Sequence, residues 1–459
     1  MPDGLGVPQV LMHADADRLA NGRMTTAALT LIGVVAAAFL IAPRSSPALL
    51  LALALLAAAW VAGADLRRQA EGTGFTLFAA LAFGLYLLLS VAWSADRSEA
   101  IGKVTLYFVF TGAVWIICSG ARLMGERLLE RLLTTLLIAL AVGLFYLCFE
   151  ELAGHWIKRE LFRLVPAIRL PERHLIIANG EVEGVRAYAS NRNMAALALM
   201  LWPMLLGAQS VLPPPWGRIA AWTMLATSAL TIGLSEHDTS LVALPAGALV
   251  FLLARGWPRL SIGLLAAGWM TATLMVVPIV SAAYRDASLH FATWLPHTAR
   301  QRVILWGYTA EQVAKRPWLG VGIAATKSLD LRRKDVEETP PGYVYPLRTG
   351  PHAHNIYLQT WYELGAIGAL LLTWLGLAVL KAIAGLSRVL MPYALACFTT
   401  ASIVGAFSWG MWQAWFMAAF GIAMALTAVS LAFAAHRRDL KLGAGTAPRP
   451  ASRVAPASG

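Results

Sequence analysis

The stretch of sequence that decides the fold reads TTAALTLIGVVAAAFLIAP at residues 25–43 and PALLLALALLAAAWVAG at residues 47–63. Neither run contains a charged residue, and each is near the roughly 20 residues that a helix needs to cross a bilayer. A helix satisfies its own backbone hydrogen bonds in lipid, and neither run shows the alternation of a membrane strand. The two runs therefore predict a hairpin of membrane-spanning helices.

The composition of the whole chain agrees with this interpretation. Of the 459 residues, 58% are hydrophobic and 14% are charged, and the mean hydropathy is +0.63. Soluble domains usually carry about a quarter charged residues. So few charges could not cover so much apolar surface, which excludes a soluble, collagen-like, coiled-coil or disordered chain. The three cysteines lie in or beside apolar runs without metal-ligand or redox spacing, which excludes a disulfide-stapled domain.

Similar apolar runs recur along the chain and predict an all-α polytopic membrane protein with about 12 transmembrane helices. They lie at residues 25–43, 47–63, 74–94, 103–120, 130–148, 194–212, 217–234, 239–254, 260–282, 356–383, 391–410 and 412–434.

The distribution of arginine and lysine predicts the orientation. Basic residues gather in every second short loop, and cytoplasmic loops carry this excess in membrane proteins. We therefore expect both termini in the cytoplasm, with two long polar segments on the outer face, where function should concentrate. The predicted order is: 1–24 cytoplasmic N-terminus; 25–148 transmembrane helices 1–5; 149–193 periplasmic segment with an amphipathic helix; 194–282 transmembrane helices 6–9; 283–355 large periplasmic catalytic segment; 356–434 transmembrane helices 10–12; 435–459 disordered cytoplasmic tail.

The first outer segment contains apolar residues at helical spacing between 157 and 168, interleaved with basic residues. This pattern predicts an amphipathic helix in the membrane interface, with a plain surface helix as the alternative. The segment then reads GVRAYASNRN at residues 184–193, directly before a span. The guanidinium of Arg186 suits phosphate oxygens, although an interfacial arginine can also reach towards lipid head groups.

The second outer segment contains a helix that we expect to begin at Thr298, because Thr298 and Gln301 have capping-box spacing. On it Arg302, Trp306 and Thr309 share one face, whereas Arg300 points away. Gly320 and Gly322 predict a tight connection. Residues 326–351, with the charge run Arg332–Lys334, predict a mobile, solvated stretch.

The tenth span opens with His354 and Asn355, where Asn355 is a suitable N-cap that leaves His354 just outside the helix. The positive end of the helix dipole should keep His354 neutral, and a neutral imidazole can accept a proton. Gln359 and Tyr362 should form a polar stripe inside the bundle, and Gly365 and Gly368 should let another helix approach. An interfacial histidine without chemistry is the alternative. A zinc site at His352 and His354 lacks a nearby third ligand, so we predict no metal.

These motifs together resemble the O-antigen ligase/polymerase family of membrane glycosyltransferases. The element His354-Asn355, nine residues, then Gly365 and Gly368 is similar to a ligase signature. The run from Arg302 to Trp306, followed by PWLGVG at 317–322, looks like the preceding family segment. Arg186 with Asn191 and Asn193 looks like the first outer-loop motif.

The resemblance implies a fold related to the C-type glycosyltransferases and an enzyme of the bacterial inner membrane with a periplasmic active site. The donor would be O-antigen on undecaprenyl diphosphate and the acceptor lipid A–core oligosaccharide, with membrane lipid as surroundings and no nucleic acid. His354 would be the base. Arg186, Arg302 and Arg300 would bind the diphosphate, without a metal or other cofactor, in an inverting displacement. The predicted supporting residues are Asn355, Asn191, Asn193, Trp306, Gln359, Tyr362, Gly365 and Gly368.

One feature departs from the family pattern, and several activities stay open. Relatives carry a Ser-Arg pair at the outer turn between the seventh and eighth spans, where this chain reads SEHD at 235–238. Arg300 or Arg192 could replace the missing arginine. An O-antigen polymerase, a protein O-oligosaccharyltransferase and a lipid-linked glycan transporter are the alternatives to a ligase.

Overall fold

The computed structural model describes residues 22–61, 74–332 and 339–445, so the predicted N-terminal segment, most of the C-terminal tail, and Arg333 and Lys334 fall outside the described residues. A helix coincides with each of the predicted apolar runs. These helices are α2 (Arg23–Ile41), α3 (Ser46–Val61), α5 (Gly74–Ser90), α6 (Arg97–Leu123), α7 (Glu126–Leu152), α9 (Asn191–Val211), α10 (Trp216–Leu234), α11 (Asp238–Gly256), α12 (Pro258–Leu274) with α13 (Val276–Ser281), α16 (Ile356–Ala384), α17 (Met391–Phe407) and α18 (Ala414–Gly445).

The described helices confirm a polytopic membrane protein. Nine of them are long and apolar enough to cross a membrane, and α12 with the bent continuation Val276–Asp286 makes a tenth, with a bend of 66°. The predicted number of about 12 is higher because two helices fall short. Helix α17 has only 17 residues, and α10, with 19 residues, is not among the helices apolar enough to span.

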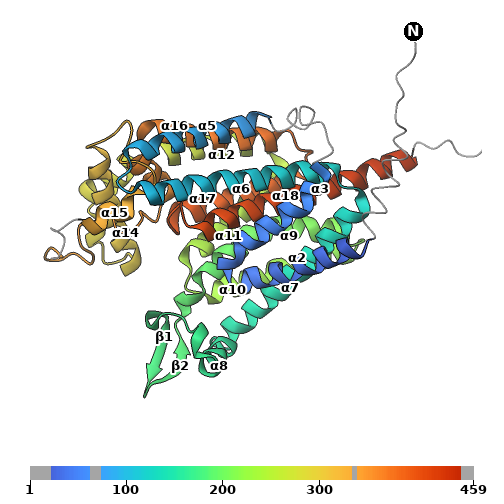
Figure 1. Ribbon diagram of the computed structural model, residues 1–459, viewed down its shortest axis with the longest axis horizontal. Helices are drawn as coiled ribbons and strands as arrows, with labels where there is room; N and C mark the ends of the chain where they lie inside the picture. Colours follow the sequence, from blue (N-terminus) through green and yellow to red (C-terminus); the bar gives the residue numbers. More distant parts are fainter. Residues whose placement is uncertain (1–21, 62–73, 333–338, 446–459) are drawn as a thin grey trace, which may run out of the picture.

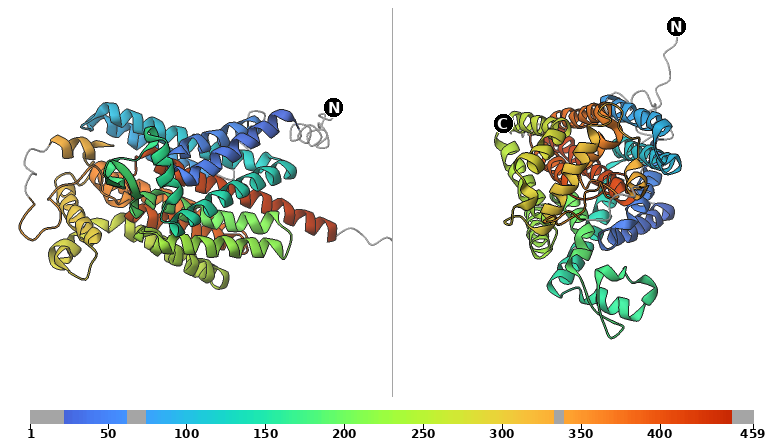
Figure 2. Two further views of the ribbon diagram at one scale, coloured as in Figure 1. Left: turned by 90° about the horizontal axis from the view of Figure 1, so that it is seen from below. Right: turned by 90° about the vertical axis from the view of Figure 1, so that its left-hand side faces the viewer.

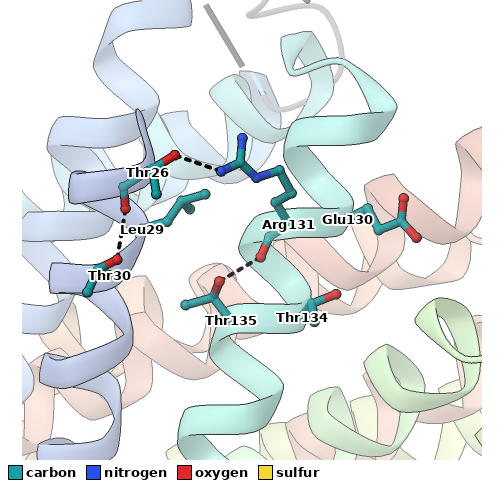
Figure 3. Close-up of a pocket in the computed structure, with 7 residues that line it drawn as sticks. All are labelled: Thr26, Leu29, Thr30, Glu130, Arg131, Thr134 and Thr135. Carbon is teal, nitrogen blue, oxygen red and sulfur yellow. Dashed lines mark hydrogen bonds between the residues drawn. The ribbon is translucent and has the colours of Figure 1, made fainter. Parts of the chain in front are cut away.

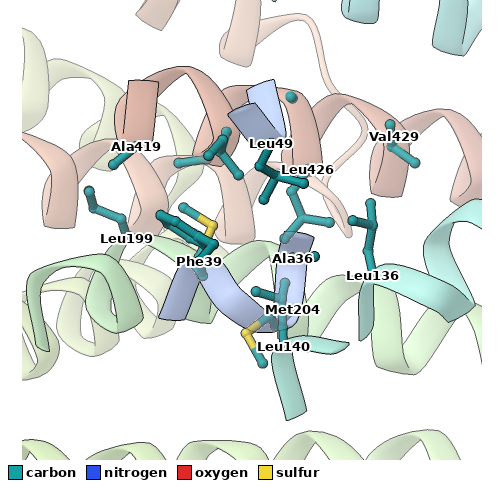
Figure 4. Packing of buried hydrophobic residues seen from close by; sticks show 14 of the residues in the cluster. Ala36, Phe39, Leu49, Leu136, Leu140, Leu199, Met204, Ala419, Leu426 and Val429 are labelled. Atoms are coloured by element: carbon teal, nitrogen blue, oxygen red, sulfur yellow. The ribbon is translucent and has the colours of Figure 1, made fainter. Parts of the chain in front are cut away.

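The core of the bundle forms around α9, which is apolar on every side, as expected for a central helix. Helix α9 packs against α7, α10, α17 and α18. Figure 4 shows side chains of this core, where Leu199 and Met204 of α9 lie among Phe39 of α2, Leu140 of α7 and Ala419 of α18.

The two long polar segments lie at one end of the bundle, and the start of α2 and the end of α18 lie at the other (Figures 1 and 2). The second segment contains η7 (Leu289–Phe291), α14 (His297–Val313) and α15 (Ala325–Arg332). Helix α14 begins at His297 after Pro296, and no side chain caps it, so the predicted capping box of Thr298 and Gln301 does not form. Proline before the first turn sets the chain direction without this cap.

The first polar segment forms a unit that projects sideways from the bundle (Figure 2, right). The predicted amphipathic helix is α8 (Trp156–Leu164). It is followed by η3 (Pro166–Ile168), η4 (Glu172–His174) and an antiparallel hairpin of β1 (Leu175–Ala178) and β2 (Glu181–Val185), which the sequence interpretation missed. The signal was present, because Asn179-Gly180 takes positive φ at both positions, as a tight two-residue hairpin turn requires.

Candidate active site

Asn355 caps the first turn of α16 as predicted. Its side-chain oxygen accepts hydrogen bonds from the backbone N–H of Tyr357 at 2.9 Å and of Leu358 at 3.0 Å. The preceding residue, His354, has a positive φ of 54°. The cap therefore fixes where the chain enters the helix, and with it the position of the imidazole.

The ring of His354 is oriented by a backbone carbonyl. Its Nδ1 donates a hydrogen bond to the carbonyl oxygen of Ser408, which lies between α17 and α18. A carbonyl oxygen only accepts, so Nδ1 carries the hydrogen and Nε2 of the neutral ring is left as a proton acceptor. This tautomer is the one that a general base needs.

The surroundings keep His354 uncharged. Burial lowers its pKa and the nearby positive charge of Arg302 lowers it further, while the hydrogen bond to Ser408 acts in the opposite direction. The ring of His352 lies 4.2 Å from that of His354, centroid to centroid. Burial, His354 and Arg192 lower the pKa of His352 to about 3. Both rings are therefore neutral near pH 7.

Helix α14 supplies the cation and holds the histidine loop. The indole N–H of Trp306 donates to the carbonyl oxygen of Ala353 at 2.7 Å. One turn earlier, Arg302 is partly buried, and its charge acts on His354, His237 and Asp238. The predicted face of Arg302 and Trp306 thus meets His354, while Thr309 turns its hydroxyl back to the carbonyl of Leu305.

The turn at 235–238 brings a residue that the sequence interpretation did not select. His237 is buried, stacks on Trp409 at 5.4 Å and shares a hydrogen bond of 2.7 Å with the Ser240 hydroxyl. Burial and the charge of Arg302 lower its pKa to about 3. A neutral histidine therefore lies beside Arg302 at the turn where relatives were expected to carry arginine.

Glu363 connects the elements beneath the histidine loop. It is fully buried and accepts hydrogen bonds from the backbone N–H of Ala324 at 2.9 Å, from Gln359 at 3.1 Å and from the side chains of Thr326 and Trp412. Gln359 in turn accepts from the backbone N–H of Met411 at 3.1 Å. Of the predicted polar stripe, Gln359 therefore belongs to a structural network, centred on Glu363, that joins α16 to the loops near residues 324 and 411.

The sequence predicted that Gly365 and Gly368 would let another helix approach closely. This prediction is wrong, because a backbone segment and a side chain of the same helix occupy the space beside them. Gly365 has φ 64° and breaks α16, and a Cβ there would lie 2.3 Å from the carbonyl oxygen of Trp318. A Cβ at Gly368 would lie 2.2 Å from Cβ of Leu364 in its own helix. The turn segment 317–322 fills the break. Its backbone pairs with α16 through Val321 N–H to Tyr362 O and Ala366 N–H to Pro317 O.

The remaining predicted site residues lie in different surroundings. Arg186 is exposed, and no contact among the described residues joins its side chain to Arg302 or His354. Arg300 is partly buried, and its Nε has no hydrogen-bond partner. Asn193 is buried and donates to the carbonyls of Leu40 and Ile41, so it anchors α9 to the end of α2. The buried Oδ1 of Asn191 has no partner.

One surface pocket lies away from these residues. This space of about 440 Å³ lies between α2 and α7, where Arg131 donates to the Thr26 hydroxyl at 3.0 Å. Figure 3 shows the residues that line it. It lies at the end of the bundle opposite His354, so we do not assign it to the site. Among the described residues, no group of three or more His, Cys, Asp and Glu side chains could hold a metal ion.

Comparison with known proteins finds a family match for part of the chain. Residues 223–373, which include His237, Arg302 and His354, match the family described as O-antigen ligase. The chain is 26% identical over 233 residues to a Rickettsia felis protein named "Putative polysaccharide ligase", covering 50% of this chain and 55% of that protein. A Rickettsia conorii protein of the same description is 27% identical over 189 residues, covering 40% and 45%. The chain spans about half the length of the relatives it matches. The chain therefore carries an O-antigen ligase family domain in a polytopic membrane protein.

Proposed function

We propose that the protein transfers an O-antigen glycan from undecaprenyl diphosphate to a sugar hydroxyl of lipid A–core oligosaccharide. The observation that carries the proposal is the pair His354 and Arg302 inside the O-antigen ligase domain. A neutral imidazole with a fixed tautomer lies in the field of a partly buried guanidinium. A base beside a fixed cation is the combination that activates a hydroxyl and stabilises an anionic leaving group.

The proposed step is a single displacement. Nε2 of His354 takes the proton of the acceptor hydroxyl as its oxygen attacks the anomeric carbon of the donor. The bond from that carbon to the diphosphate oxygen breaks, and undecaprenyl diphosphate leaves with the electron pair. Arg302 stabilises the growing charge on that oxygen. Attack from the side opposite the leaving group inverts the anomeric centre. Arg186 and Arg300 stay predicted diphosphate ligands.

Reconstitution tests the activity. Purified protein in detergent, with excess EDTA, is expected to form the larger glycolipid from lipid-linked glycan and lipid A–core, since the proposed step uses no metal. Elongation of a second lipid-linked glycan would instead identify a polymerase. The absence of any product with either acceptor would reject the proposal, and restoration by a divalent ion after EDTA treatment would replace the arginine role with a metal one.

We propose that this end of the bundle faces the periplasm of a bacterial inner membrane, because the arginine-rich short loops lie at the opposite end. A cysteine introduced at the exposed Glu181 should react with an impermeant thiol reagent once the outer membrane is permeable. Labelling only after inner-membrane lysis would contradict this orientation.

Replacing Arg302 by lysine should lower kcat/KM by at least about tenfold, because lysine keeps the charge but loses the planar fork. Arg316→Lys, at an exposed position just beyond α14, is the matched control and should keep the wild-type value. Steady-state rates at varied donor concentration make the measurement. Equal rates for both variants would remove Arg302 from the diphosphate site.

A further inference from the structure

A second group of cations lies next to the candidate active site and is not used in the proposed step. It consists of Arg44 in η1 (Pro43–Ser45), Arg173 in η4 and Arg192 in the first turn of α9. These residues come from three separate parts of the chain. Their meeting is therefore a product of the fold and not of local sequence.

Independent hydrogen bonds bring the three elements together. Asn193 donates to the carbonyls of Leu40 and Ile41 at 2.7 and 2.8 Å, which places Arg192 beside the turn that carries Arg44. On the projecting unit, the Tyr188 hydroxyl donates to the Arg173 carbonyl, and the Arg186 N–H donates to the His174 carbonyl at 2.9 Å. These bonds hold η4 against the residues that lead directly into Arg192.

The Trp415 ring, against which Arg192 packs, is also held in place by a hydrogen bond between distant parts of the chain. The Ser46 hydroxyl donates to the Trp415 carbonyl at 2.7 Å, which ties the start of α18 to the start of α3. The guanidinium of Arg192 then lies 5.8 Å from the centre of the Trp415 ring. A guanidinium stacked on an aromatic ring keeps its N–H groups directed outward for another partner.

The charges of this group are not compensated within the described part of the chain. Arg44 and Arg173 lie close enough to act electrostatically on Arg192, and all three contribute, after burial, to lowering the pKa of His174. None of the three takes part in an ion pair there, and the buried Nε of Arg192 has no hydrogen-bond partner. Arg302 differs, because Asp238 partly balances its charge. Three neighbouring guanidinium groups without a carboxylate form a site for an anion.

The position of the group relates it to the base. Arg192 acts on His352, and the ring of His352 lies 4.2 Å from that of His354. An anionic group held by the three arginines would therefore place its neighbouring sugar close to His354. The substrate whose hydroxyl must reach the base is the acceptor. Arg44 and Arg173 are exposed, and Arg173 belongs to the unit that projects from the bundle, so an oligosaccharide head group can reach both.

We propose that Arg44, Arg173 and Arg192 form a second anion site, which binds a phosphate group on the oligosaccharide of the acceptor glycolipid and directs its hydroxyl to His354. This inference rests on the proposed function. It assigns the two anionic substrates to different cations, with the donor diphosphate at Arg302 and the acceptor phosphate at the three-arginine group.

The test uses the double variant Arg44→Gln/Arg173→Gln, since both side chains are exposed and their loss leaves the anchoring hydrogen bonds in place. The matched control is Arg218→Gln/Arg259→Gln, which removes two exposed charges near the opposite end of the bundle. Full-length protein is studied in phosphatidylcholine nanodiscs. Binding is measured in the His354→Ala background, with a phosphorylated acceptor glycolipid and with the same lipid after phosphatase treatment.

Protein with the three arginines unmodified should bind the phosphorylated lipid about tenfold or more tightly than the phosphatase-treated lipid. One well-made charged contact changes the dissociation constant by about that factor. The double variant should lose this preference and the control should keep it. With active enzyme, the KM for acceptor should rise about tenfold while the KM for donor stays unchanged.

Three outcomes would overturn the proposal. A rise in the KM of the double variant for the donor would assign the group to the diphosphate. A preference of the double variant for the phosphorylated lipid as large as that of the unmodified protein would leave the group without an acceptor role. In nanodiscs that also contain phosphatidylglycerol, the group would be assigned to membrane head groups if this lipid raised the activity of the unmodified protein and the double variant lost that increase while it kept the glycolipid preference. Binding needs no transfer, so preference without product would reject the proposed activity alone, and product without preference would reject this site alone.

Discussion

Replacement of His354 by alanine is expected to leave a folded protein that binds the lipid-linked donor but has lost transfer activity by about 10²–10⁴-fold, the usual contribution of a general base. The ring contributes one proton acceptor, Nε2, whose availability follows from the bond between Nδ1 and the Ser408 carbonyl. Asn355 caps α16 with its own side chain, so the helix start survives the change. Initial rates and donor binding of the purified variant make the measurement.

The pH dependence of the wild type belongs to the same prediction. Burial and Arg302 hold the pKa of His354 below its ordinary value, which is about 6.5 for histidine. The base is therefore already neutral at pH 7, and the rate should fall only as acidification below the ordinary histidine range protonates it. A rate that falls already between pH 8 and 7 would contradict the buried, neutral base.

His352→Ala is the control within the same loop and should cost much less activity. Its ring packs against His354, and its buried Nε2 has no hydrogen-bond partner. Near-wild-type turnover by His354→Ala would remove the base assignment. A larger loss from His352→Ala would move the base two residues upstream and leave the reaction class intact.

The fold could be predicted from the sequence where the determinants are local. Apolar runs without charges placed the helices, and the Asn355 cap follows from one side chain and the two N–H groups it accepts from. The hairpin at 175–185 was missed because its strands are short and lie in a segment first recognised by its helical spacing. The Asn179-Gly180 turn carried enough information to find it.

The site was less predictable because its partners are distant in the chain. Glu363 accepts hydrogen bonds from Ala324, 39 residues earlier in the chain, and from Trp412, 49 residues later. Nothing near Glu363 in the sequence indicates these partners. Arg186 and Arg192 are six residues apart, but η5 (Ala187–Ser190) lies between them and Arg192 is already in the first turn of α9. Arg186 is exposed, whereas Arg192 lies close enough to His352 to lower its pKa electrostatically. Sequence spacing alone could not distinguish them.

Gly365→Ala should have the largest effect on folding. The residue has φ 64° and ψ −163°, a region that side chains other than hydrogen essentially exclude. The added Cβ would also lie 2.3 Å from the Trp318 carbonyl oxygen and 2.6 Å from the Leu319 nitrogen, and backbone cannot move aside as a side-chain end can. We expect a loss of at least about 3 kcal/mol in the free energy of unfolding, combining backbone strain and overlap. Thermal unfolding in detergent and the yield of monodisperse protein measure it.

Gly102→Ala is the matched control, because Gly102 lies in α6 with nothing within 4 Å of an added Cβ. Alanine there should be neutral or slightly stabilising, by up to about 1 kcal/mol, since it favours helix over glycine. If Gly365→Ala unfolded like the wild type, the segment 317–322 could not be fixed in the break of α16. The consequence would extend to function, because that segment leads into the Ala324 and Thr326 contacts of Glu363, and Glu363 binds Trp412 close to the chain that carries Ser408. The Gly365→Ala protein could fold but be inactive, while Arg302→Lys still weakens its donor binding as it does in the wild type. This result would show that the break positions the base and not the diphosphate.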